Sequence, residues 1–374
     1  MLDGAMAFLC EADRLKSVAR ANVLMDLSRP ENSAEHSWHV ALYALVFGAS
    51  DRAIAMILLH DLVEIDTGDQ PIHLDHDAPA LALAEAQAAR RIFGLAPNGA
   101  RLARLWQDFE AQADACARVA KRMDHVQPIF QVLQAAVPLP DHVTIVRDNL
   151  QHGRAARMAG EWPEVASAVR ALLDGHPPEL GDLAGQLAFL AEADRLKSVS
   201  RASILLDGSR RENSAEHSWH LALYALVLGG LAAPGVDVGR VIRMLLIHDL
   251  VEIDVGDVPL HSAGGQAHGS EAVRAAEAAA ARRLFGLLPE AQGAGLLALW
   301  QEFEAVETPD AIFAKALDRC QPAVQNLRGG GAGWVEYDVT LPQIEARVEP
   351  WVAAGSPALW DWLQAGLRAH FAAA

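Results

Sequence analysis

Residues 31–39, ENSAEHSWH, recur without a change at residues 212–220. The two stretches lie inside a longer ungapped match, in which residues 6–47 and 187–228 agree at about 32 of 42 positions. The match resumes in three later pairs of segments: LLHDLVEIDTGDQP (58–71) with LIHDLVEIDVGDVP (246–259), LWQDFEA (105–111) with LWQEFEA (299–305), and KRMDHVQP (121–128) with KALDRCQP (315–322). Equivalent residues are 181 to 194 positions apart. A solenoid repeat has only about 20 to 50 residues, so each copy should be a whole domain.

The division of the chain into domains follows from this duplication. We expect a first domain at residues 1–178 and a second at 179–374, with the boundary inside the Pro- and Gly-containing segment 174–185. The similarity is uneven, because residues 72–88 and 260–280 barely match whereas the polar clusters are identical. A recent duplication would explain the overall likeness of the copies. It does not explain the unevenness, so the retained polar residues need a physical reason.

Both copies have the apolar periodicity of helices. His36, Val40, Tyr43 and Phe47 recur at helical spacing, and Ala, Leu, Arg and Glu dominate each copy. Gly and Pro residues mark the ends of such segments, one of which is expected to span Asp51–Gly68. No alternation typical of strands persists. We therefore expect an all-α fold of two bundles, each with about six or seven helices.

Composition and charge exclude several classes of protein. The 374 residues include 31 Lys and Arg against 48 Asp and Glu, a formal net charge of −17, and 52% of them are hydrophobic. This hydrophobic content excludes a disordered chain, and the acidic balance argues against nucleic acid, whose binding requires basic residues to neutralise phosphates. No apolar run approaches the roughly 20 residues of a membrane span. Three separated cysteines suit reduced thiols, so we expect a cytoplasmic protein without nucleic-acid or membrane partners.

Each copy carries a lone His, an adjacent His-Asp pair and a later Asp, all in helical surroundings. The set is complete in both copies: His36, His60, Asp61 and Asp124 in the first, and His217, His248, Asp249 and Asp318 in the second. Two imidazoles and two carboxylates suit an octahedral divalent ion such as Mn, Fe, Co, Mg or Zn, with positions left for water and substrate. A single His-Asp dipeptide is common by chance, whereas the ordered set of four in both copies is specific. We expect one divalent metal ion in each domain.

The motifs resemble those of the HD-domain metal-dependent phosphohydrolases, and within them the 5'-deoxynucleotidase group. The resemblance covers roughly residues 6–150 and 187–340. It rests on four motifs in each copy: Arg followed after ten residues by ENSAEHS, H-D-x-x-E-x-x-x-G-D, L-W-x-x-F-E and K-x-x-D. The family fold is an all-helical bundle that commonly forms a homodimer. The resemblance therefore implies two tandem HD-domain bundles, packed within one chain as a pseudo-dimer.

The resemblance also assigns roles to individual residues. The two His, the Asp of the pair and the later Asp of each copy are the implied metal ligands. The other implied site residues are Glu64, Asp69, Glu252 and Asp257 as catalytic carboxylates, and Arg20, Arg201, Lys121 and Lys315 as contacts of the substrate phosphate. Ala21 and Ala202 stand where the bacterial enzymes carry a Trp beside the sugar, which leaves the preference for deoxyribose over ribose open.

The residue types suit these roles physically. On a helix, Glu64 would lie one turn beyond His60 and Asp61, close to the metal, where a carboxylate can hold a water. Asp69 follows Gly68, where the chain can turn back toward the site and where an acid could protonate the leaving 5' oxygen. The sequence does not decide which carboxylate serves the water and which serves the leaving group.

The favoured function is a metal-dependent phosphohydrolase that releases phosphate from nucleoside 5'-monophosphates, with deoxynucleotides as the expected small-molecule substrates. One alternative is hydrolysis of a nucleoside triphosphate or another phosphorylated metabolite. Another is a nucleotide-sensing module without turnover, which would not need the Glu and Asp pairs. His73 and His261 offer a weaker alternative, as extra ligands of a two-metal site. His39 and His220 suit either a position behind the first ligand or a helix interface.

Overall fold

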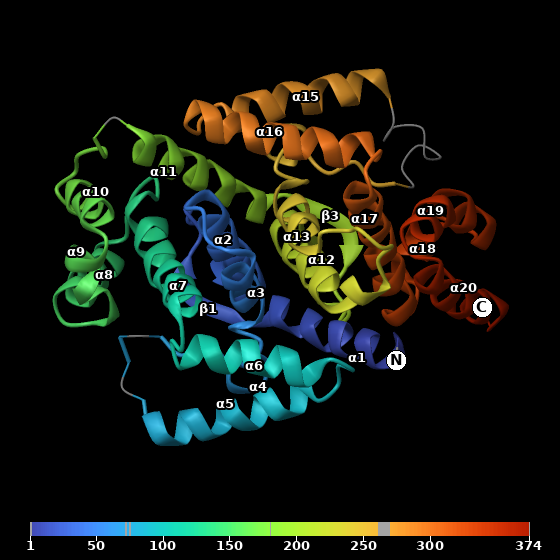
Figure 1. Cartoon of the computed structure of the whole chain (residues 1–374), viewed down its shortest axis with the longest axis horizontal. Helices are drawn as coiled ribbons and strands as arrows, with labels where there is room; N and C mark the ends of the chain where they lie inside the picture. The colour runs from blue at the N-terminus through green and yellow to red at the C-terminus, as the bar shows by residue number, and fades with distance from the viewer. Residues whose placement is uncertain (1, 72, 75, 180, 261–269, 374) are drawn as a thin grey trace.

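The computed structural model describes residues 2–71, 73–74, 76–179, 181–260 and 270–373, which form two helical halves (Figure 1). The first half contains α1 (Leu2–Ala12), η1 (Asp13–Ser17), α2 (Ser33–Val46), α3 (Asp51–Leu59), α4 (Glu64–Thr67), α5 (Ala78–Phe93), α6 (Gly99–Glu110), α7 (Ala115–Leu133), α8 (Pro140–Gln151), η2 (Arg154–Arg157), α9 (Met158–Glu161) and α10 (Pro163–Leu173). The second contains α11 (Asp182–Ala193), η3 (Asp194–Ser198), α12 (Ser214–Leu228), η4 (Gly229–Leu231), α13 (Val238–Ile247), α14 (Glu252–Val255), α15 (Glu271–Phe285), α16 (Glu290–Ala305), α17 (Pro309–Arg328), α18 (Ala332–Glu336), α19 (Leu341–Gly355) and α20 (Pro357–Ala373). The elements named η are short 3-10 helices.

Each half also contains a short antiparallel pair of strands, which the sequence did not predict. Strand β1 (Ala19–Val23) pairs with β2 (Pro30–Asn32), and β3 (Ser200–Ile204) pairs with β4 (Arg211–Asn213). Strands of three to five residues are too short for an alternating pattern to stand out. The fold is otherwise helical, as expected. Each half has ten α-helices in its described part rather than the six or seven predicted, and two of the ten are only four or five residues long.

The single helix predicted at Asp51–Gly68 is divided in two. Helix α3 ends at Leu59, and the chain passes through a turn before α4 begins at Glu64. Gly68 ends α4 with a φ of +71°, a conformation in which any other residue would be strained. The His-Asp pair therefore lies in the turn between two helices rather than within one.

Helix α2 begins at a capping box, which explains part of the repeated ENSAE sequence. The Asn32 side chain accepts hydrogen bonds from the N–H groups of Ala34 and Glu35, both at 3.0 Å. The Glu35 carboxylate accepts in return from the N–H of Asn32 at 2.7 Å. Asn213 and Glu216 repeat this capping box at the start of α12. The caps satisfy the first N–H groups of both helices and fix the direction of the strands before them.

Helices α2 and α12 pack against each other near the centre of the molecule (Figure 1). The pair α5 and α6 lies on one side of them, and the pair α15 and α16 lies on the opposite side. Helices α8 to α10 and α18 to α20 occupy opposite ends. In addition, α1 of the first half packs on α12, and α11 of the second half packs on α2. Each half therefore contributes a helix to the core of the other.

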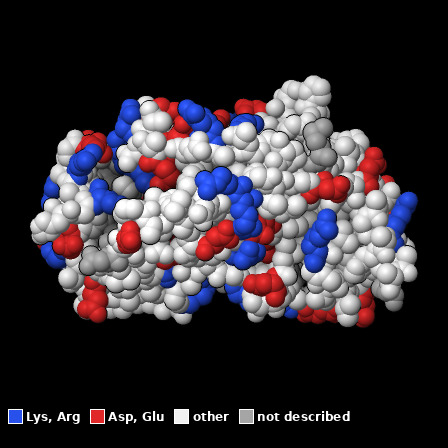
Figure 2. Space-filling model, turned by 90° about the horizontal axis from the view of Figure 1, so that it is seen from below, with Lys and Arg blue, Asp and Glu red and all other residues white. Residues whose placement is uncertain are grey.

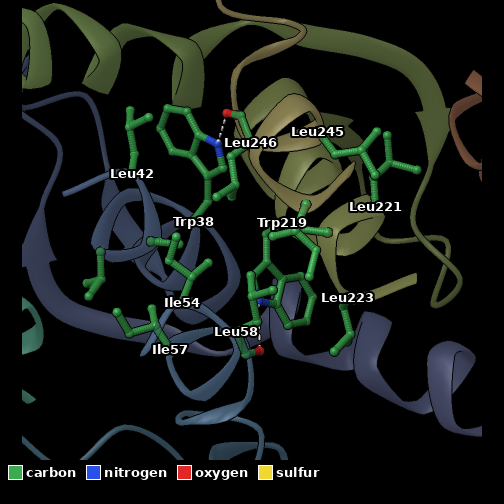
Figure 3. Packing of buried hydrophobic residues seen from close by; sticks show 14 of the residues in the cluster. Trp38, Leu42, Ile54, Ile57, Leu58, Trp219, Leu221, Leu223, Leu245 and Leu246 are labelled. Carbon is green, nitrogen blue, oxygen red and sulfur yellow. Dashed lines mark hydrogen bonds between the residues drawn. The ribbon is translucent and has the colours of Figure 1, made fainter. Parts of the chain in front are cut away.

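The contacts between the halves are reciprocal. Trp38 Nε1 donates a hydrogen bond to the carbonyl oxygen of Leu246 at 3.0 Å, and Trp219 Nε1 donates to that of Leu58 at 3.2 Å. Figure 3 shows both indoles among leucine and isoleucine side chains from the two halves. Both tryptophans are fully buried. Reciprocal contacts of this kind are the contacts expected of a pseudo-dimer with approximate two-fold symmetry.

The segment that connects the halves lies between α10 and α11. Helix α10 ends at Leu173 and α11 begins at Asp182. The domain limits themselves, 1–178 and 179–374, stay predictions.

The surface mixes both signs of charge. Figure 2 shows Lys and Arg side chains interspersed with Asp and Glu over one face of the molecule. Within the described ranges, every helix is too short or too polar to cross a lipid bilayer.

Replacing Trp38 by Ala should lower the free energy of unfolding of the whole chain by about 3 to 5 kcal/mol, because it leaves a cavity in the core between the halves. Trp351→Ala is the matched control and should have a much smaller effect, because that side chain is 40% exposed. Urea unfolding followed by circular dichroism measures both changes, and a single transition is expected. Two separate transitions, of which Trp38→Ala moved only one, would contradict a core shared by the halves.

Candidate metal centre

The four predicted ligands of the first half converge where the turn after α3 meets α2 and α7. His60 Nε2 lies 3.1 Å from Asp61 Oδ1 and 3.6 Å from Asp124 Oδ1. His36 Nε2, from α2, lies 3.4 Å from the same Asp124 oxygen and 3.9 Å from Asp61 Oδ2. Both imidazoles are buried. The structure therefore brings together residues that are up to 88 positions apart in the chain.

The second half repeats the cluster. His248 Nε2 lies 3.1 Å from Asp249 Oδ1 and 3.8 Å from Asp318 Oδ1. His217 Nε2 lies 3.5 Å from Asp318 Oδ1 and 3.8 Å from Asp249 Oδ2. In both halves the two His and the adjacent Asp each place one ligand atom within 4.8 Å of the others. All eight predicted ligands thus form two clusters of four.

The orientations of the His60 and His248 rings would suit metal ligands. Nδ1 of His60 lies 2.7 Å from the carbonyl oxygen of Ile57, and Nδ1 of His248 lies 2.9 Å from that of Leu245. Because a carbonyl oxygen only accepts, Nδ1 carries the proton and Nε2 is left as an acceptor. Both Nε2 atoms are buried and have no hydrogen-bond partner within the described part of the chain. An acceptor nitrogen that faces carboxylate oxygens needs a cation between them, so the residues fit a divalent ion.

A proline within α7 lies one helical turn beyond Asp124, the last predicted ligand. Pro128 follows Asp124 by four residues and has no N–H to donate to the Asp124 carbonyl oxygen. Pro322 has the same relation to Asp318 in α17. The helical hydrogen-bond ladder is therefore interrupted at the ligand in both halves. The Gln-Pro pair that both copies retain therefore lies next to the site.

The two predicted catalytic carboxylates of the first half lie next to the ligands. Glu64 Oε2 accepts a hydrogen bond from Ser33 Oγ at 2.5 Å. Burial, together with the charge of Asp61, raises the pKa of Glu64 to about 8. Asp69 Oδ2 accepts from the N–H of Ala21 at 3.2 Å, so the turn after α4 does bring this carboxylate back to the site.

Arg20, on β1, is the cation that faces these carboxylates. Its Nη1 donates to Asp61 Oδ2 at 2.9 Å and lies 3.6 Å from Glu64 and 3.5 Å from Asp69. Burial acts to lower the pKa of Arg20, but these three carboxylates and that of Glu31 outweigh it and raise that pKa. One guanidinium thus faces four carboxylates, because Glu31 also lies 3.7 Å from Arg20 Nε.

Arg201 has equivalent partners in the second half. Its Nη1 donates to Asp249 at 2.7 Å and lies 3.5 Å from Glu252 and 3.8 Å from Asp257. Ser214 donates to Glu252, as Ser33 does to its counterpart. Burial and the charge of Asp249 raise the pKa of Glu252 well above its usual range.

One predicted lysine lies at the edge of each cluster, Lys121 in the first half and Lys315 in the second. Lys121 Nζ donates to Glu110 at 3.2 Å and lies 4.2 Å from the centre of the Phe109 ring. Phe109 in turn packs edge-on against the ring of His60. Lys315 makes the equivalent contacts in the second half. The L-W-x-x-F-E motif therefore supplies both a core aromatic and an acid that orients a lysine.

Sequence reasoning missed two residues that contact the site. Glu31, on β2, is fully buried and places Oε2 3.4 Å from His36 Nδ1 and 3.7 Å from Arg20 Nε. Ser33 donates to the catalytic Glu candidate, as described above. Both belong to the stretch ENSAEHS, and its unchanged repetition was the available signal.

Two further histidines named from the sequence, His39 and His220, lie at the interface between the halves rather than in the clusters. Their Nε2 atoms lie 3.0 and 2.9 Å from carbonyl oxygens of the other half. Burial and the charge of a nearby lysine lower the pKa of His220 to about 3, so it is neutral. His73 lines the first pocket, whereas His261 lies outside the described residues.

Each cluster opens into a pocket, and the two pockets differ. The first has a volume of about 500 Å³ and the second about 230 Å³. His142 of α8 contributes to the wall of the first, whereas Trp334 of α18 and the adjacent Tyr337 line the second. Ala21 and Ala202 line their respective pockets. The candidate ligand clusters are thus nearly identical, while the pocket walls have diverged.

The fold and the clusters together define a duplicated helical domain with a candidate metal centre in each copy. The HD domain family model matches residues 12–166 and 193–360, so the chain belongs to the HD-domain family. It is 31% identical to the mouse 5'-deoxynucleotidase HDDC2 over 146 residues, which are 39% of this chain and 70% of the mouse protein. It is 29% identical to the human 5'-deoxynucleotidase HDDC2 over 162 residues, 43% and 74% of the two chains.

Among the solved structures that are similar to this chain is one from a bacterium. It is the crystal structure of a predicted metal-dependent phosphohydrolase from Magnetospirillum magnetotacticum MS-1, with 46% sequence identity and a TM-score of 0.47. The match covers 50% of this chain and 95% of the bacterial chain.

Proposed function

We propose that the protein is a metal-dependent phosphohydrolase that releases phosphate from nucleoside 5'-monophosphates, with deoxynucleotides as the preferred substrates. The observation that carries this proposal is the convergence, in both halves, of two imidazoles and two carboxylates beside an arginine and two further acids. Similarity to proteins named 5'-deoxynucleotidases supports the substrate class. We place one divalent ion in each half and the protein in the cytoplasm.

The ion of the first half would be held by four side chains. They are His36, His60, Asp61 and Asp124, with His217, His248, Asp249 and Asp318 as their counterparts. A bound divalent ion supplies a Lewis acid that lowers the pKa of bound water and neutralises phosphoryl oxygens. The acidic surroundings otherwise repel a phosphate, so this positive charge also admits the substrate.

The other residues of the site bind the phosphate and move protons. Arg20 presents a planar guanidinium that suits two phosphate oxygens. Glu64 has one oxygen fixed by Ser33, and its other oxygen faces the Arg20 guanidinium. Asp69 is held by a backbone N–H at the same guanidinium. Glu64 and Asp69 divide the two proton transfers, one at the attacking water and one at the leaving 5' oxygen.

A phosphate-release screen tests the proposal. The purified chain is treated with a chelator and assayed with nucleoside 5'-monophosphates and triphosphates in the presence of Mn, Co or Mg. Inorganic phosphate should be released from deoxynucleoside monophosphates and only when metal is restored. Release of triphosphate from nucleoside triphosphates would favour the alternative substrate class. Nucleotide binding without any release would favour the sensing module.

Metal analysis should find two ions per chain at saturation, because both ligand clusters are complete. His60→Ala should reduce this number to one and leave the second site filled. His152→Ala is the matched control and should keep two ions, because its side chain is 72% exposed and far along the chain from any ligand. A parent chain that held no more than one ion under saturating metal would contradict the assignment.

The double variant Glu64→Ala with Glu252→Ala should keep both ions, because neither carboxylate is assigned as a ligand. Its turnover should fall by about 10²- to 10⁴-fold, the range lost when a proton-transfer group is removed. Glu164→Ala with Glu290→Ala is the control pair, since both residues are exposed glutamates in the first turn of a helix. Parent-like rates in the Glu64/Glu252 variant would show that these carboxylates are not catalytic.

A further inference from the structure

The sequence DRLKS occurs unchanged at residues 13–17 and 194–198, and the sites described above leave it without a role. The two stretches form η1 and η3 and carry Lys16 and Lys197. Both lysine side chains are buried. A buried ammonium group is strongly destabilising unless it is paired and hydrogen-bonded. The partners of these two lysines therefore show what the stretch does.

Lys197, from the second half, extends into the first half. Its Nζ donates to Glu31 Oε1 at 2.7 Å and to Gln131 at 2.9 Å, both in the first half. It also donates to Asp194 of its own half at 2.6 Å. All three ion-pair members are nearly or fully buried, so solvent does not screen the pairs.

Lys16 makes the reverse connection, from the first half into the second. Its Nζ donates to Glu212 at 2.6 Å, lies 2.9 Å from Nδ1 of His220 and donates to Asp13 of its own half. The spacing of Asp13, Glu212 and His220 would by itself suit a metal ion. Lys16 Nζ contacts all three, however, so an ammonium group already supplies the positive charge.

Glu31 connects Lys197 to the candidate metal centre of the first half. One of its oxygens takes the lysine hydrogen bond, and the other lies 3.4 Å from His36 Nδ1 and 3.7 Å from Arg20 Nε. None of these last three atoms has another hydrogen-bond partner in the part of the chain that the structure describes. Glu31 therefore lies against both the His36 imidazole and the Arg20 guanidinium.

Glu212 has the same position in the second half. Its free oxygen lies 3.4 Å from His217 Nδ1 and 3.7 Å from Arg201 Nε, and its other oxygen takes the hydrogen bond of Lys16. A group that contacts the outer nitrogen of a ligand imidazole fixes the orientation of the ring and commonly changes metal affinity by about 10- to 100-fold.

We propose that Lys16 and Lys197 are positioning residues that act across the interface. Lys197 of the second half fixes Glu31, and through it the ligand His36, in the first site. Lys16 of the first half fixes Glu212 in the second site. Each metal centre is therefore completed by the opposite half of the chain. This inference rests on the metal centres proposed above.

A crossed cobalt titration tests the proposal on the full chain. The chelator-treated protein is titrated with Co²⁺, and binding is followed by the visible absorption of the bound ion. In a His248→Ala background only the first site remains, and in a His60→Ala background only the second. Lys197→Met should weaken Co²⁺ binding by about 10- to 100-fold in the first background and by less than about twofold in the second. Lys16→Met should show the opposite pattern.

A second pair of variants covers the case in which the methionine variants do not fold. Lys197→Arg and Lys16→Arg keep the positive charge, but a planar guanidinium cannot reproduce the contacts of a compact ammonium group. They should show the same crossed pattern with a smaller loss, while far-UV circular dichroism stays like that of the parent.

The outcomes separate this proposal from the one on which it rests. Equal losses at both sites would mean that the lysines only stabilise the fold, and a loss confined to the lysine's own half would also overturn the proposal. Unchanged affinity in all four lysine variants would do the same. If the two His→Ala backgrounds bound no Co²⁺ before any lysine was changed, the metal centres themselves would be refuted.

Discussion

The structure depends on the burial of two equivalent helices on nearly every side. Helices α2 and α12 form the centre of the interface and also supply the first candidate ligand of each site, so neither keeps a solvent face of its own. Polar side chains in such a helix must find partners inside the protein. Even the helix caps are shared, because Asn32 Nδ2 donates to Glu216 and Asn213 Nδ2 donates to Glu35, both at 2.8 Å. Helix start, interface and site thus form one connected structure.

The buried charged groups of each site also need partners inside the protein. In the first half, Arg20 faces the carboxylates of Asp61, Glu64, Asp69 and Glu31, and two imidazoles meet a fifth carboxylate, that of Asp124. Buried like charges of this density repel one another unless positive charge is added. Burial, together with the charge of Asp61, raises the pKa of Glu64 even beside the Arg20 guanidinium. An ion that satisfies the ligands therefore also relieves the acids that are proposed to act on the substrate.

Much of the site could be predicted because the duplication marks the retained polar residues. His36, the adjacent His60 and Asp61, and Asp124 lie on three separate parts of the chain, yet their repetition in the second copy predicted the cluster that the structure brings together. The short strands could not be predicted, because three to five residues are too few for a period to show. The role of Glu31 and of the buried lysines depends on which half lies behind which, and helical periodicity carries no information about contacts 166 residues apart. The helix before Gly68 was predicted to be continuous because its apolar residues keep one helical period through the turn, so periodicity alone did not show the break.

The presence of both halves in one gene product changes how the sites can evolve. In a dimer of identical subunits, every substitution enters both sites at once. Here a substitution in α8 or α18 alters one pocket wall and leaves the other as it was, and the two walls already carry different residues, such as His142 and Trp334. The shared interface keeps the halves together while selection acts on each pocket separately. In a single chain of this kind, the two pocket entrances can diverge while both halves keep the same cluster of candidate ligands.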